Sequence, residues 1–119
     1  MQPSHLLNIV YVALLLGLSW YAMMAVHVLG HVLGALATGG VVERVVLHPL
    51  AISRTDVSPN PHPAVVAWLG PFVGCLLPLL PYAAMPRRFA FWRRLAGFFA
   101  GFCLVLHGAY IGLGSFAAL

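Results

Sequence analysis

Residues 6–38, LLNIVYVALLLGLSWYAMMAVHVLGHVLGALAT, form an apolar run that decides the class of this protein. A helix of these 33 residues would be roughly 50 Å long, against about 30 Å for the hydrocarbon core of a bilayer. We therefore predict a membrane-spanning helix that tilts, protrudes or breaks. The run is longer than the apolar core of a signal peptide and no cation precedes it, so we do not expect cleavage. Gly39 and Gly40 predict its end, because glycine favours the position just past a helix C-terminus.

The composition extends this interpretation to the rest of the chain. Of its 119 residues, 62% are hydrophobic and 7% are charged, whereas globular proteins average about 25% charged residues. The six cations are all arginines and the only acids are Glu43 and Asp56, which gives a net charge of +4. Such a chain has too little soluble surface for a nucleic-acid interface. We predict a single all-α membrane domain over residues 1–119, with the lipid bilayer as its partner.

Two further apolar runs, residues 64–84 and 95–118, bring the predicted number of transmembrane helices to about three. Pro71, Pro78 and Pro81 predict that the second helix is bent and packed against the first, where a neighbour can satisfy the freed carbonyls. Pairs of glycines four residues apart predict close helix contacts. These pairs are Gly30 and Gly34, Gly97 and Gly101, and Gly108 and Gly112.

The loop of residues 41–63 is the one extended polar connection. Residues 41–46 are rich in β-branched side chains and residues 52–57 alternate apolar with polar, so we predict a short β-hairpin at the membrane surface. Prolines 59, 61 and 63 end it and start the next helix. The connection before the third helix carries Arg87, Arg88, Arg93 and Arg94 among aromatic residues, a mixture typical of the membrane interface.

His27 and His31 are the notable polar groups of the first helix. Residues four apart lie on one helical face, so both imidazoles point into the same small volume and can share a metal ion. The metalloprotease pattern His-Glu-x-x-His places a general base beside the first ligand. Here that position is Val28. His107 in the third helix is the candidate third ligand for zinc, provided that the third helix packs along the Gly30 face and the first helix protrudes at its start.

The segment VHVLGHVLGALATGGVVERVVLHP, residues 26–49, resembles the opening of the M50 (site-2 protease) family of intramembrane zinc metalloproteases. AWLGPFVG at 67–74 and GAYIGLGSF at 108–116 resemble later stretches of its compact M50B-like branch, in the same order. The resemblance implies a bacterial inner-membrane protein. The family's catalytic glutamate, however, falls on Val28, and its later aspartate ligand has no counterpart. The resemblance therefore implies a relative without peptidase activity, or a chain whose downstream segment is absent.

Three functions remain open. The first, which we favour, is a catalytically inactive binding or structural subunit of a larger membrane complex, in which the histidines serve hydrogen bonding between helices. The second is a zinc-dependent metallopeptidase-like enzyme that uses His27, His31 and His107. The third is a haem- or chlorophyll-binding membrane subunit, because a buried histidine is a common axial ligand.

Two arguments about orientation conflict. The rule that cationic loops stay in the cytoplasm places the arginines of residues 87–94 inside and the hairpin outside. The family resemblance implies the reverse, and we favour the charge rule because it acts on this sequence directly.

Overall fold

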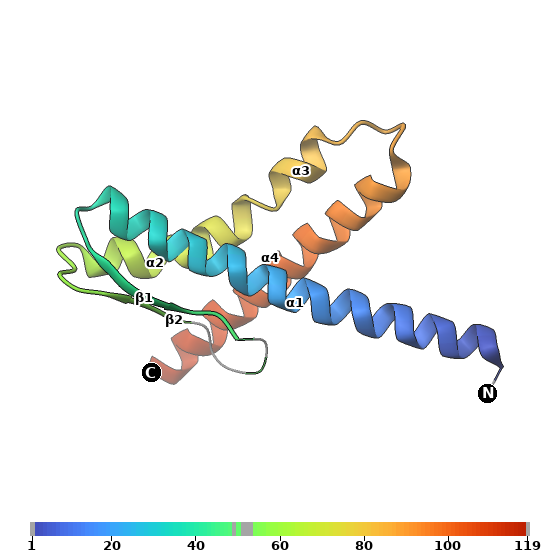
Figure 1. The fold of residues 1–119 in the computed structure, drawn as a ribbon, viewed down its shortest axis with the longest axis horizontal. Coiled ribbons are helices and arrows are strands. Elements are labelled where there is room, and N and C mark those ends of the chain that lie inside the picture. The colour runs from blue at the N-terminus through green and yellow to red at the C-terminus, as the bar shows by residue number, and fades with distance from the viewer. Residues whose placement is uncertain (1, 49, 51–53, 119) are drawn as a thin grey trace.

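The computed structural model describes residues 2–48, 50 and 54–118. In chain order its elements are α1 (Pro3–Ala37), β1 (Val42–Val46), β2 (Arg54–Val57), α2 (Pro63–Leu76), α3 (Leu79–Ala84) and α4 (Ala90–Ala118) (Figure 1). Three described segments are long and apolar enough to cross a membrane, namely Pro3–Ala37, Pro63–Ala84 and Ala90–Gly114. The predicted outline of three apolar helices with a two-stranded hairpin is confirmed.

Helix α1 is a single helix of 35 residues. It begins at Pro3, a residue well suited to the first helical position. It ends as predicted, because Gly39 adopts a φ of 81° and the Gly40 amide donates to the Ala35 carbonyl at 2.8 Å. Its N-terminal half projects beyond the other helices (Figure 1). Of the three outcomes predicted for this long run, a break is excluded, because the helix is continuous from Pro3 to Ala37.

The Gly30 face of α1 packs against α2 and does not receive the third helix, which was the condition set for the three-histidine zinc site. A Cβ placed on Gly30 would press on the Leu69 carbonyl oxygen and lie 2.9 Å from the Gly70 Cα. A Cβ on Gly34 would lie 3.2 Å from the Val66 Cα. Only glycine at these positions permits the two backbones to come so close, so the α1–α2 pair forms the centre of the fold.

Helix α4 crosses α1 closer to the middle of α1 than α2 does. There the fully buried Cys103 joins Met23 and Met24 in a small core, which is flanked by three α4 side chains, Phe99, Phe102 and Leu106, and by Leu47, the residue after β1. The predicted close contacts along the α4 glycines are found only at Gly97, where a Cβ would lie 2.9 Å from the Tyr82 ring. A Cβ on Gly101, Gly108 or Gly112 would meet nothing within 4 Å. That face of α4 is open in the described chain.

The second apolar run is bent, as its prolines predicted. Helix α2 ends at Leu76 and α3 begins at Leu79, with the buried Pro78 between them. This bend turns α3 away from α1 and toward the start of α4 (Figure 1).

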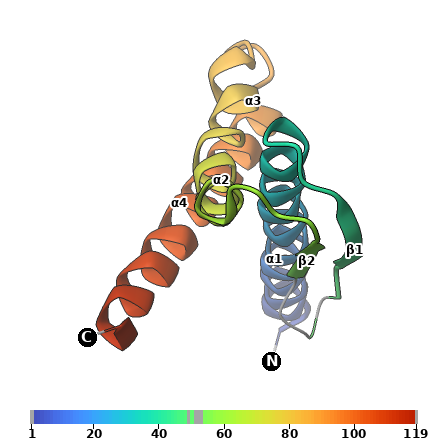
Figure 2. The ribbon, with the colours of Figure 1, turned by 90° about the vertical axis from the view of Figure 1, so that its left-hand side faces the viewer.

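The hairpin is antiparallel, with Val42 opposite Val57 and Val46 opposite Arg54. It folds back beside α1, on the other side from α4 (Figure 2). At its base, Val57 packs over Gly40, where a Cβ would lie 2.9 Å from the valine Cγ1. The predicted strands are confirmed for residues 42–46 and 54–57, while residues 52 and 53 lie outside the described residues. The hairpin therefore runs back alongside the second half of α1.

Gly30→Ala tests the close approach of α1 and α2. The added methyl has no space against the α2 backbone, so we expect a loss of about 1–3 kcal/mol in the free energy of unfolding. Gly17→Ala is the matched control on the same helix, because its Cβ would meet nothing within 4 Å. Denaturation in detergent micelles measures both. Equal stability of the two variants would contradict the proposed contact.

Candidate functional site

The three histidines singled out in the sequence come together. Nδ1 of His27 lies 3.0 Å from Nε2 of His107, and Nε2 of His27 lies 2.9 Å from Nε2 of His31. The His27 and His107 rings are nearly parallel, with 19° between their planes, whereas His31 meets His27 edge-on at 80°. Helices α1 and α4 thus contribute to one cluster of imidazoles, which we call the histidine cluster.

The histidine cluster lies near the C-terminal end of α1 and the N-terminal end of α2. His31 is six residues before the end of α1, and Gly70, which contacts it, is seven residues after the start of α2. At 1.5 Å per residue, both positions lie about 10 Å from those helix ends. Arg94 lies 13 residues before His107 on α4, or about 20 Å away. The histidine cluster is therefore near one end of α1 and of α2 and well inside α4.

Backbone carbonyls orient the two outer rings of the cluster. His31 donates from Nδ1–H to the Val66 carbonyl of α2 at 2.6 Å. His107 donates from Nδ1–H to the Cys103 carbonyl, one turn earlier on α4, at 2.8 Å. Because a carbonyl oxygen has two lone pairs, it can accept this bond in addition to its helical one. Both outer rings are therefore left with Nε2 directed at His27.

Two glycines of α2 provide the space for these rings. A Cβ on Gly70 would run into the His31 ring, and a Cβ on Gly74 would run into the His107 ring. Gly70 and Gly74 are both buried and stand four residues apart, so they face the same way. Sequence reasoning included them in a family-like stretch but did not assign them to the site. Their four-residue spacing was the signal that could have found them.

The number of N–H hydrogens in the histidine cluster limits how many of its contacts can be hydrogen bonds. Four contacts, two between nitrogens and two to carbonyls, need four hydrogens if all are hydrogen bonds. Three neutral imidazoles supply only three N–H groups. With the carbonyls taking two of them, the neutral cluster leaves one pair of nitrogen lone pairs facing each other. A cation at the cluster, whether a proton or a metal ion, would relieve that contact.

The three imidazoles do not fit one metal ion in this arrangement. Zinc–nitrogen bonds of about 2.0–2.1 Å in a tetrahedral site hold ligand nitrogens about 3.3 Å apart, farther than the 2.9 and 3.0 Å found here. His27 also turns a different nitrogen toward each neighbour, so one ion cannot use both contacts. Consistently, among the described residues no group of three or more His, Cys, Asp or Glu side chains is placed to hold a metal ion.

The position beside His27 is apolar and closed. Val28 is buried, with 5% of its surface exposed. Both acids of the chain lie in the hairpin, where Glu43 is exposed and Asp56 pairs with Arg54 at 3.2 Å. Val28 cannot accept a proton from water, so the general-base role has no side chain at the position where the metalloprotease pattern supplies it.

Comparisons with protein-family models, with curated proteins and with solved structures find no match to this chain. The resemblance to the M50 family therefore rests on the residues quoted above.

His107→Ala tests whether the histidine cluster holds α4 to the α1–α2 pair. The change removes two hydrogen-bonding contacts and leaves Nδ1 of His27 without its contact on α4, so we expect the free energy of unfolding to fall by about 1–2 kcal/mol. The matched control is His5→Ala, at an exposed position near the start of α1. Denaturation in detergent micelles is the measurement. If both variants are as stable as the wild type, the cluster contributes nothing to packing.

Proposed function

We propose that this chain is a non-peptidase relative of the M50 intramembrane metalloproteases that serves as a binding or structural subunit of a larger membrane complex. The observation that carries the proposal is that the histidine cluster is closed on itself. Two of its N–H groups bond backbone carbonyls, and the remaining ring nitrogens face one another. A peptidase needs an open metal position and a base, and here Val28 occupies the position of the base.

The open face of α4 supports the role in a complex. Gly108 and Gly112 have space where a Cβ would stand, and Val105 is 70% exposed. Small residues let a neighbouring helix approach closely in a bilayer, where packing drives helix association. The chain also has little soluble surface with which to recognise a substrate by itself. Residence in a bacterial inner membrane follows from the family resemblance and is part of the proposal.

Zinc binding is the second candidate function, and one observation favours it. Zinc-ligating histidines usually donate their other ring N–H to a carbonyl or carboxylate, as His31 and His107 do here. The His27 ring would have to turn so that a single nitrogen faces the same point as the other two. Such an ion would hold helices together, because Val28 still provides no base. Haem or chlorophyll would instead need a ring nitrogen free to act as axial ligand.

The purified wild-type protein is expected not to cleave membrane peptides, with or without added zinc. General-base catalysis is typically worth about 10²–10⁴-fold in rate, and the side chain that would supply it is missing. Mass spectrometry of incubated peptide substrates is the measurement. Zinc-dependent cleavage that is abolished by His27→Ala would overturn the proposal.

Metal analysis and an absorption spectrum of the same sample separate the alternatives. Equimolar zinc that is lost in His107→Ala would favour the zinc candidate, and an absorption band of a tetrapyrrole would favour haem or chlorophyll.

A pull-down from native membranes tests the subunit role. We expect the wild-type chain to retain one or more membrane proteins, and Gly108→Leu with Gly112→Leu to lose them, because the leucines fill the face that a partner helix would use. Gly17→Leu is the matched control, since Gly17 also has open space around it but lies on α1. Identical recovery with the control and the α4 variant would place any partner elsewhere. Recovery of no partner by the wild-type chain would contradict the subunit role.

A further inference from the structure

A groove of about 620 Å³ lies between α3 and the first half of α4, apart from the histidine cluster. Three arginines, Arg87, Arg93 and Arg94, line one end of it. Farther along, its walls are apolar or small, with Leu79 on α3 and Leu104 on α4. The groove therefore combines a cationic end with an apolar channel.

Glycines of α4 make the floor of this groove. At Gly97 the Tyr82 ring of α3 lies over the helix, so that a Cβ would be 2.9 Å from the ring. One turn farther on, a Cβ at Gly101 would meet nothing within 4 Å, although Gly101 lines the groove. Tyr82 thus covers the floor near the arginines, and the floor is open beyond it.

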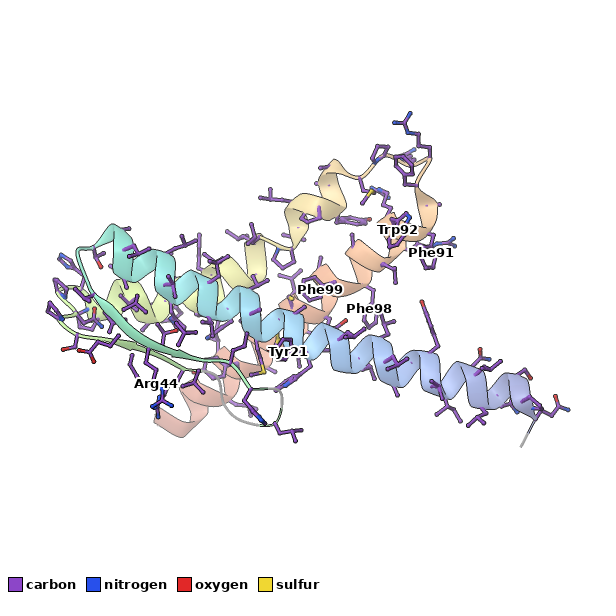
Figure 3. All side chains as sticks on the ribbon, in the orientation of Figure 1. Tyr21, Arg44, Phe91, Trp92, Phe98 and Phe99 are labelled. Atoms are coloured by element: carbon purple, nitrogen blue, oxygen red, sulfur yellow. The ribbon has the colours of Figure 1, made fainter. Side chains whose placement is uncertain are left out.

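The length of the groove matches one leaflet of a bilayer. Arg94 and Leu104 are ten residues apart on α4, which corresponds to about 15 Å along the helix. That is about half of the 30 Å hydrocarbon core. Phe91 and Trp92 flank the arginine end, on the first turn of α4 (Figure 3). Since aromatic side chains and arginines gather at the membrane interface, this end lies at the depth of the lipid headgroups.

No acidic side chain pairs with the arginines of the groove in the part of the chain that the structure describes. The two acids, Glu43 and Asp56, are both in the hairpin, and Asp56 already pairs with Arg54. Arg93 lies over the Tyr82 ring at 4.5 Å from its centre, a contact that holds the side chain without neutralising it. The planar guanidinium groups match the geometry of a phosphate group, which they bind through paired hydrogen bonds. These arginines are therefore available to bind an external anion.

We propose that this groove binds an anionic glycerophospholipid, with its phosphate at Arg87, Arg93 and Arg94 and an acyl chain along Gly101 and Leu104, beyond the Tyr82 ring. The apolar channel distinguishes a lipid from a peptide, because a peptide backbone would need hydrogen-bonding partners that these side chains lack. The site is independent of the histidine cluster, and it assigns the arginines a specific ligand in addition to their effect on topology.

Native mass spectrometry of the purified protein with phosphatidylglycerol and, separately, phosphatidylcholine tests the proposal. We expect phosphatidylglycerol to bind more tightly. Because each arginine at an anionic membrane surface contributes about five-fold in affinity, the double variant Arg87→Gln/Arg94→Gln should lose about 25-fold for phosphatidylglycerol and little for phosphatidylcholine. Arg44→Gln is the matched control, since Arg44 is an exposed arginine of β1.

Gly101→Leu tests the acyl channel separately from the charge. The side chain has space in the fold but fills the groove, so it should displace part of the acyl chain and weaken phosphatidylglycerol binding about ten-fold, whereas Gly17→Leu should not. Denaturation in detergent without added lipid confirms that the variants are folded. Equal binding of the two lipids by the wild type, or unchanged binding by Gly101→Leu, would overturn the proposal. Inorganic phosphate that displaces the lipid at equal concentration would assign the site to free phosphate and also overturn it.

Discussion

The close approach of α1 and α2 at Gly30 and Gly70 is the contact on which the rest of the structure depends. With no Cβ on Gly30, the helix backbone can lie against the Leu69 carbonyl of α2. This short separation brings His31 within reach of the Val66 carbonyl and leaves room for its ring over Gly70. A larger residue at either glycine would push the helices apart and remove the place in which the histidines meet.

The histidine cluster then connects α4 to the α1–α2 pair. Polar groups inside a membrane protein are costly unless they bond to one another or to the backbone. His31 and His107 do both, and His27 lies between them in contact with each ring. Beside them, Cys103 packs on Met23 and Met24. The polar contacts fix the position of α4 along α1. Apolar packing alone specifies this position poorly, because apolar side chains resemble the surrounding lipid. This structural role needs neither a metal ion nor a catalytic base.

The acidic side chains and most of the arginines lie in different parts of the molecule. The acids lie in the hairpin, whereas four arginines lie around the turn from α3 to α4 without a carboxylate. Arginines that cannot pair within the chain bind anions of the surroundings, and at a membrane surface those are chiefly phosphate groups. The groove between α3 and α4 places such a group beside an apolar channel, so one arrangement of helices serves both headgroup and acyl chain.

The sequence by itself determined the three apolar helices, the end of α1 at Gly39, the two strands and the common face of His27 and His31. Each of these follows from local properties, namely hydropathy, the φ preference of glycine, β-branching and helical periodicity. Only the tertiary structure decided that α2, and not α4, takes the Gly30 face, because a glycine pair shows that a helix can approach but not which one. It also decided that the imidazoles face one another at 2.9 and 3.0 Å. Hydrogen-bonded and metal-bound histidines differ by a few tenths of an ångström and a ring rotation, and residue spacing along one helix carries neither quantity.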